Sequence, residues 1–188
     1  MGAVGSRESF FRAGFDVLAE LGYGGLKLAA VCRRLGVTSG SFYHYFESWS
    51  DYTRQLVAHW HEETTVWVVD AVRNETDPRR RVDTLIKGAL SLPHGAEAAI
   101  RVWGSIDPRV RTVQAAVDHQ RFDAVFESAL PVLGSRRQAE MFASWSVYLL
   151  VGYEQALLPR DPDRLEWLVT QLLDSLDAGR FESVPDGD

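Results

Sequence analysis

The chain has 188 residues, of which 46% are hydrophobic and 24% charged, the ordinary composition of a globular protein with a well-filled core. Its formal net charge of −6 argues against a protein that coats nucleic acid without specificity, because such proteins are basic. The single cysteine, Cys32, excludes an intrachain disulfide, and no apolar run has the length of a secretory signal or a membrane span. We therefore expect a cytoplasmic protein with no membrane partner.

The first two predicted helices cover residues 10–21 and 28–35. In the first, apolar residues recur on one helical face and Gly22 provides a helix end. In the second, an apolar face is formed by Leu28, Val31, Cys32 and Leu35. We expect Cys32 to be a small buried side chain of this helix, since this is the commonest place for a free cysteine.

Residues 36–46 combine a tight turn with a short third helix. Gly36 gives the backbone freedom that a sharp turn requires, and Val37 can fill the angle between the two helices. The third helix can be capped by Thr38 or Ser39, and it opens with three small residues, Ser39, Gly40 and Ser41. It ends in side chains suited to phosphate and base-edge contacts, namely Tyr43, His44 and Tyr45. This order of elements is typical of a helix-turn-helix.

Over residues 6–56 the chain resembles the DNA-binding domain of the TetR family of bacterial transcriptional regulators, most specifically in the run GVTSGSFYHYF at residues 36–46. The resemblance implies DNA contacts from Lys27, Thr38, Ser39, Gly40, Ser41, Tyr43 and His44. Phe42 and Phe46 are expected in the core instead. The implied domains are a DNA-binding domain at residues 1–50, a helical ligand-binding and dimerisation domain at 51–182, and a disordered tail at 183–188.

The predicted DNA-binding domain departs from the family in its charge. Ser39 stands where the family usually has lysine, and Trp49 stands where it usually has a basic residue. The first 60 residues nevertheless carry six basic and five acidic side chains, whereas the remaining 128 carry fourteen and twenty-one. A slightly basic segment on an acidic body favours a protein that contacts DNA with one end only, with modest nonspecific affinity.

The rest of the chain keeps a helical pattern, and three Asp-Pro pairs mark helix starts, at residues 77–78, 107–108 and 161–162. The predicted helices cover residues 49–74, 78–91, 95–105, 108–130, 135–157 and 162–176. No segment alternates as a strand would. The sequence therefore predicts an all-α fold of about nine helices, which is also the number that the resemblance implies.

The last two predicted helices carry more apolar surface than one chain of this size is expected to cover. The candidate interface residues are Trp145, Leu149, Leu165, Leu168, Val169, Leu172 and Leu176. A four-helix interface with a second copy would cover them, and the resemblance implies the same homodimer. The alternative is that these stripes pack inside a single chain.

The central helices are rich in aromatic residues, and the resemblance implies that a ligand pocket lies among them. The candidate ligand-binding residues are Trp67, Trp103, His119, Tyr148 and Glu154. The implied function is transcriptional regulation, as a repressor whose binding to a short palindromic operator is relieved by a small apolar or amphipathic ligand.

Two alternatives stay open. The run His59–Glu63 contains the one cluster that resembles metal ligands, so an all-helical metal-dependent enzyme is the first alternative. The second is a ligand-binding or protein-binding module whose DNA-binding domain has decayed, which the missing cations favour. We expect no catalytic residues, no metal and no cofactor, because no nucleophile, phosphate-loop or cysteine-pair motif is present.

Overall fold

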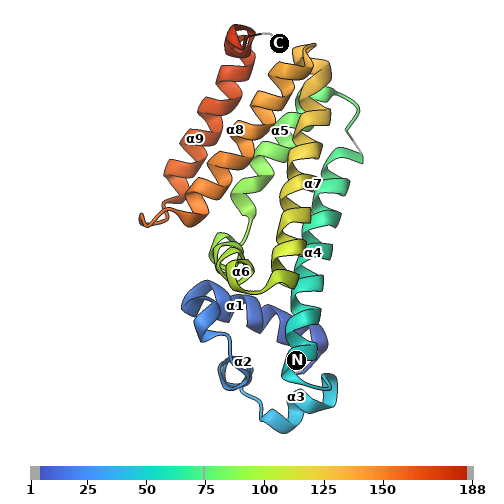
Figure 1. Cartoon of the computed structure of the whole chain (residues 1–188), viewed down its shortest axis with the longest axis vertical. Helices are drawn as coiled ribbons and strands as arrows, with labels where there is room; N and C mark the ends of the chain where they lie inside the picture. Colours follow the sequence, from blue (N-terminus) through green and yellow to red (C-terminus); the bar gives the residue numbers. More distant parts are fainter. Residues whose placement is uncertain (1–4, 74, 186–188) are drawn as a thin grey trace. The chain divides into compact units, whose positions relative to one another are not determined.

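The computed structural model describes residues 5–73 and 75–185, without the side chains of residues 65–71 and 73. These residues form nine α-helices and two short 3-10 helices and contain no strand, which confirms the predicted all-α fold (Figure 1). The α-helices are α1 Arg7–Gly25, α2 Leu28–Leu35, α3 Ser39–Tyr45, α4 Trp49–Arg73, α5 Pro78–Gly88, α6 His94–Ile106, α7 Pro108–Leu133, α8 Arg136–Gln155 and α9 Pro162–Asp177. The 3-10 helices are η1 Ala89–Ser91 and η2 Arg180–Ser183.

The helices begin where local chemistry predicts. Each of the three Asp-Pro pairs opens a helix, and each carboxylate accepts a backbone N–H of the first turn: Asp77 from Arg80 at 3.0 Å, Asp107 from Arg109 at 2.9 Å and Asp161 from Arg164 at 3.1 Å. Gly22 leaves the helical conformation with φ 66°, close to the predicted end of the first helix. None of the described helices is long and apolar enough to span a bilayer.

The chain forms two compact units. Unit 1 comprises the residues up to Glu63 together with Pro93–Ala115, and unit 2 comprises Thr64–Leu92 and the residues from Ala116 onward. The helices α4 and α7 therefore contribute residues to both units. The predicted functional division at residue 50 stays a prediction, because compactness alone does not test it.

In unit 1, aromatic side chains join α1, α3 and the start of α4. The ring of Phe10 lies 5.7 Å from that of Phe42 and 5.6 Å from that of Phe46, in edge-on contacts. Tyr52 contacts the same cluster, and all four side chains are at most 2% exposed. The predicted core positions of Phe42 and Phe46 are therefore confirmed.

The helix α6 packs directly on α1 within unit 1. A Cβ at Gly95 would lie 3.1 Å from the Cα of Ala19 and 3.2 Å from its carbonyl oxygen, so a larger residue would push the two helices slightly apart. Near the other end of α6, the ring of Trp103 stacks on that of Tyr23 with centroids 4.9 Å apart. The two contacts hold α6 against the helix that precedes the helix-turn-helix.

The core of unit 2 lies between α5, α7, α8 and α9 (Figure 1). Four of the residues predicted to meet a second copy are buried there within the single chain: Leu165, Val169, Leu172 and Leu176. That prediction is wrong for these four, because the other helices of unit 2 already cover the apolar stripe of α9. The alternative, packing inside one chain, holds for them.

The segment after α9 also packs on this core. The turn η2 includes Ser183, the ring of Phe181 is buried 5.3 Å from that of Phe142, and Val184 is half-buried against the same cluster. The beginning of the tail that was predicted to be disordered is thus part of unit 2. Residues 186–188 lie outside the described residues.

Candidate functional site

The turn between α2 and α3 is tied to α2 by several hydrogen bonds. Gly36 is left-handed, with φ 68° and ψ 30°, and its N–H donates to the carbonyl of Arg33 at 3.2 Å. Val37 donates to the carbonyl of Cys32 at 3.0 Å, and the thiol of Cys32 donates to the carbonyl of Thr38 at 3.8 Å. Cys32 is buried as predicted, and desolvation raises the pKa of its thiol. The glycine, the short turn and the thiol together fix the direction in which α3 leaves.

The third helix begins at a threonine cap. Thr38 is extended, with φ −85° and ψ 163°, and its Oγ1 accepts from the N–H of Ser41 at 3.4 Å. A Cβ at Gly40 would meet only the Thr38 side chain, at 3.5 Å, so the packing of this chain does not require glycine there. The exposed start of α3 is therefore free to approach another surface closely.

The two residues predicted to hold phosphates are both exposed on α3. Tyr43 is 56% exposed and His44 is exposed beside it, while Phe42 turns into the core. Tyr45 has a different role, because its hydroxyl donates to the carbonyl of Gly5 and its ring packs 5.6 Å from that of Phe10. The face of α3 that is open to a ligand therefore carries Tyr43 and His44, and Tyr45 belongs to the packing.

Acidic neighbours neutralise much of the positive charge in this region. Three arginines of the first 60 residues pair with carboxylates: Arg12 with Glu8, Arg34 with Glu20 and Arg54 with Asp51. The hydrogen bond from Arg34 holds the pKa of Glu20 below its usual range. Lys27, which precedes α2 without a side-chain cap, and Arg33 are exposed, and no described carboxylate lies within 4.0 Å of either. These two are the basic groups best placed to meet an anion.

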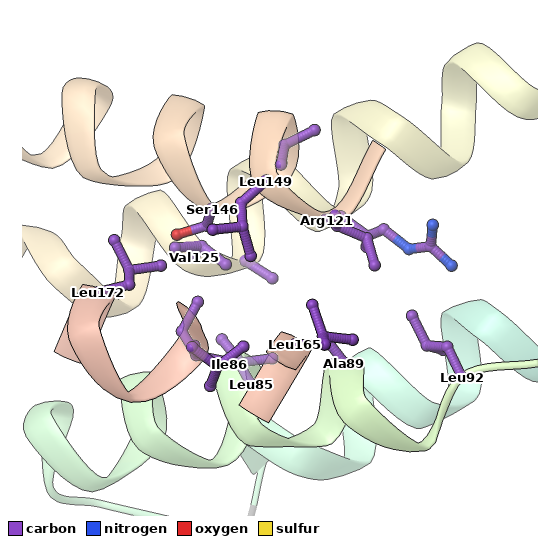
Figure 2. A pocket seen from close by; sticks show the side chains of 14 residues that line it. Leu85, Ile86, Ala89, Leu92, Arg121, Val125, Ser146, Leu149, Leu165 and Leu172 are labelled. Atoms are coloured by element: carbon purple, nitrogen blue, oxygen red, sulfur yellow. The ribbon is translucent and has the colours of Figure 1, made fainter. Parts of the chain in front are cut away.

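Unit 2 contains an apolar pocket that opens to solvent and has a cavity volume of about 50 Å³ (Figure 2). It lies between α5 with η1, α7, α8 and α9, and its lining is largely aliphatic: Leu85, Ile86, Ala89, Leu92, Ala124, Val125, Val147, Leu149, Leu150, Leu165, Val169 and Leu172. Two polar side chains complete it. Ser146 donates to the carbonyl of Phe142 at 2.8 Å, and Arg121 lies beside Leu92 at one end in this view.

None of the predicted ligand-binding residues lines this pocket. Trp103 belongs to unit 1, His119 is exposed, and Tyr148 is 73% exposed on α8. Glu154 is buried in unit 2 but is not part of the lining, and Trp67 lies outside the residues whose side chains are described. Trp103 lines a separate hollow in unit 1 and Tyr148 lines another beside η2, so the ligand-binding residues stay a prediction.

Arg121 and Ser146 were not among the pocket residues predicted from the sequence. The pattern of buried residues along α7 could have indicated Arg121. A buried stripe runs along α7 at spacings of three and four residues: Val110, Gln114, Val117, Arg121, Val125 and Ser128. An arginine inside an otherwise mostly apolar stripe is unusual, because charged side chains are rarely buried without a role. Ser146 has no comparable signal, since a serine in a helix commonly donates to the carbonyl four residues before it.

Part of the predicted dimer surface is exposed on the outer face of α8. Trp145 is 46% exposed, Tyr148 is exposed one turn later, and both border a groove that η2 closes on one side. Trp167 is exposed on α9, and Leu168 is half-buried. Leu149 is half-buried and faces the pocket instead. We refer to Met141, Trp145 and Tyr148 as the α8 outer face.

The histidine and glutamate cluster of α4 packs with its neighbours. The Nε2 atom of His59 lies 3.3 Å from Oε1 of Glu63, and its ring stacks on that of Phe11 with centroids 4.8 Å apart. In the part of the chain that the structure describes, no group of three or more histidine, cysteine, aspartate or glutamate side chains could hold a metal ion.

Comparison with known proteins agrees with this geometry. Residues 10–49 match the model of the bacterial regulatory proteins of the tetR family. A TetR-family transcriptional regulator from Agrobacterium tumefaciens shares the fold at a TM-score of 0.71 and 16% identity, over 89% of this chain and 95% of that one. No curated protein matches the sequence.

Two further solved structures share the fold and contain ligands. A transcriptional regulator from Saccharomonospora viridis in complex with choline matches at a TM-score of 0.70 and 12% identity, over 89% of this chain and 95% of that one. The transcriptional regulator FadR from Bacillus subtilis in complex with stearoyl-CoA matches at a TM-score of 0.68 and 14% identity, over 93% of this chain and 99% of that one. The helix-turn-helix region of the chain thus matches the tetR-family model, and the chain shares the all-α fold of solved TetR-family transcriptional regulators.

Proposed function

We propose that the chain is a homodimeric repressor that binds a short palindromic operator through α3 and releases it when a small ligand enters the pocket of unit 2. The observation that carries the DNA-binding part is the exposed surface of α3. There Thr38 caps a helix whose small residues precede the exposed Tyr43 and His44. A helix with small residues at its start can enter the major groove, and hydroxyl and imidazole groups can donate to phosphates.

The proposed partner in the dimer is a second copy of the chain, bound through the α8 outer face and the exposed side of α9. Large exposed aromatic side chains favour such an interface, because tryptophan and tyrosine are enriched at the centres of stable protein contacts. Trp145 and Tyr148 on α8 and Trp167 on α9 supply them. Two copies of α3 would then meet successive major grooves, which is why the operator is expected to be a palindrome.

The proposed ligand resembles the acyl chain of the FadR ligand more than choline. Binding of a quaternary ammonium group commonly uses an aromatic cage, and none of the described residues that line the pocket is aromatic. An aliphatic lining favours an alkyl or acyl group, because its burial is driven by the apolar area removed from water. The ligand relieves repression if it binds more tightly to the conformation that does not bind the operator.

The test is binding of the purified protein to DNA, measured by fluorescence anisotropy at several salt concentrations. Duplexes from the intergenic region upstream of the gene are compared with scrambled duplexes of the same composition. We expect sequence-dependent binding with a shallow dependence on salt, because few cations are available. The variant Tyr43→Ala should bind at least about tenfold more weakly, whereas Thr84→Ala, an exposed change on α5, should bind like the wild type.

A second candidate function is a ligand-binding module with a decayed DNA-binding domain. It is favoured by the pairing of Arg12, Arg34 and Arg54 with carboxylates, which weakens the field around α3. Equal and weak binding to all fragments in a genome-wide selection of bound DNA would support this candidate. Enrichment of one palindromic sequence in that selection would exclude it.

A further inference from the structure

We infer that the unit 2 pocket binds an amphipathic anion, with its carboxylate at Arg121 and its unbranched alkyl chain among the aliphatic side chains of α5, α8 and α9. The inference rests on the proposed function, because it names the ligand class of the pocket through which that function is regulated. It concerns Arg121, a buried cation in an otherwise largely aliphatic lining.

The burial of Arg121 is the first argument. Arg121 is only 7% exposed, and it lines the pocket together with Leu92 and Ala89. A guanidinium stays charged at all physiological pH values, so it cannot avoid the cost of burial by losing its proton. It has five N–H donors, and a carboxylate bound side-on uses two of them. A ligand carboxylate can therefore bind Arg121 in addition to any protein group that it already contacts.

The rest of the lining is the second argument. Leu85, Ile86, Leu165 and Leu172 face the same space as Arg121 from α5 and α9 (Figure 2). The hydroxyl of Ser146 donates to the carbonyl of Phe142, so toward a ligand it can only accept a hydrogen bond. It does not compete with Arg121 for a carboxylate. One end of the pocket thus suits an anion and the remainder suits a hydrocarbon chain.

The lining offers no contact for the opposite class of ligand. Among the described residues that line the pocket, none is acidic, so a cationic ligand would find no carboxylate on the lining to bind. A neutral alcohol of the same length would gain the apolar contacts but only a neutral hydrogen bond. The affinity of the pocket should therefore differ among an anion, a cation and an alcohol that carry the same alkyl chain. This difference makes the inference testable with simple probes.

The experiment is isothermal titration calorimetry of the full-length protein with decanoate, decanol and decyltrimethylammonium. Decanoate is expected to bind at least about tenfold more tightly than decanol, because a hydrogen bond to a charged group is stronger than a neutral one. The ammonium is expected not to bind in the pocket. From octanoate to dodecanoate the affinity should rise roughly fourfold for each added methylene. These comparisons use the unmodified protein and do not depend on the folding of a variant.

Variants then locate the anion. Arg121→Met should lower the affinity for decanoate to that for decanol and leave the affinity for decanol within about twofold. Arg137→Met, at an exposed position of α8, is the matched control and should change neither. Ala89→Phe should fill the pocket and abolish binding of both probes, while circular dichroism and the melting temperature show that the helices persist.

Equal affinity for decanoate and decanol, or full decanoate affinity in Arg121→Met or in Ala89→Phe, overturns the inference. Release of operator DNA by each probe is measured separately by anisotropy. If decanol releases the DNA as well as decanoate does, the proposed regulation stands and the anionic class is wrong. If decanoate binds through Arg121 without weakening the DNA complex, the inference stands and the proposed regulation is wrong.

Discussion

The hydroxyl of Tyr52 occupies the space that Gly14 leaves beside α1 and donates from there to the carbonyl of Phe10 at 2.9 Å. Burial raises the pKa of Tyr52, so the group remains a donor at all relevant pH values. A Cβ at Gly14 would collide with this hydroxyl and would lie 3.1 Å from a methyl group of Leu56. The glycine thus lets α4 reach the backbone of α1 in the middle of unit 1.

We predict that Gly14→Ala destabilises the protein by about 1–3 kcal/mol, because overpacking displaces the tyrosine and breaks its hydrogen bond. Urea unfolding followed by circular dichroism measures the change. The matched control is Gly24→Ala in the same helix, where a Cβ meets nothing within 4 Å. The control should be neutral or slightly stabilising, because alanine is the better helix former. Equal stability of the two variants would contradict the close contact.

A second prediction concerns the charge of α3. Ser39 is exposed in the first turn of this helix, where the family usually has lysine. In Ser39→Lys, one more phosphate contact should steepen the slope of log affinity against log salt concentration by about 0.9. Between about 50 and 200 mM salt the variant should therefore lose roughly 3.5-fold more affinity than the wild type.

Anisotropy titrations on one duplex at four salt concentrations measure this slope. The control Ser105→Lys adds the same charge at an exposed position of α6. It should raise the net charge without changing the slope by more than about 0.3, because a distant charge acts only through the screened field of the protein. A steeper slope in the control alone would show that α6, and not α3, faces the DNA.

A third prediction concerns assembly through the α8 outer face. Tyr148 is 73% exposed, and in a symmetric dimer each copy would bury it against the other. Tyr148→Glu should weaken dimerisation at least about 100-fold, because a carboxylate would be desolvated at the interface without a partner. Sedimentation equilibrium measures the constant. Val102→Glu, which adds a carboxylate at an exposed apolar position of α6, is the control and should leave the dimer intact. A monomeric wild type would contradict the interface itself.

The sequence predicts the helices of this chain well because their ends depend on local chemistry. Asp77 and Asp161 cap their own helices, and Gly36 adopts the left-handed conformation that the turn needs, whatever the distant parts of the chain do. The small residues at the start of α3 and the position of Tyr43 on that helix also depend only on residues nearby in the sequence. These features could be identified from positions that lie close together along the chain.

Which helix or chain covers an apolar stripe depends on residues far away in the sequence. For the stripe on α9, the sequence pattern alone therefore gave a wrong interpretation. Leu172 has the spacing of an interface residue, but α5, α7 and α8 cover it within the same chain. The pocket is formed by side chains from four helices, so its aliphatic character depends on which faces meet. Arg121 could have been noticed as a charge within a buried stripe. Its place beside Leu92, at the end of the pocket, required the fold.

The last prediction concerns the pH dependence of unit 2. Nε of Arg79 donates to Oδ1 of Asp177 at 2.6 Å and its second nitrogen, Nη2, donates to Oδ2 at 2.7 Å, which ties α5 to α9. This hydrogen bonding lowers the pKa of Asp177 from its ordinary value near 3.8. Since the pKa is lower in the folded state, the unfolded state takes up the proton first as the pH falls. The contribution of Asp177 is therefore complete above about pH 5 and is lost as the pH falls through the folded pKa.

Asp177→Asn should lower the free energy of unfolding at pH 7 by about 0.2–1 kcal/mol, the range for a largely exposed ion pair, and the difference from the wild type should shrink below pH 4. Urea titrations at pH 7 and at pH 3 measure both differences. The control Asp174→Asn removes an exposed carboxylate near the end of the same helix, where a negative charge opposes the helix dipole. It should be neutral or slightly stabilising at pH 7. A constant deficit in Asp177→Asn at both pH values would mean that the side chain contributes through packing and not through its charge.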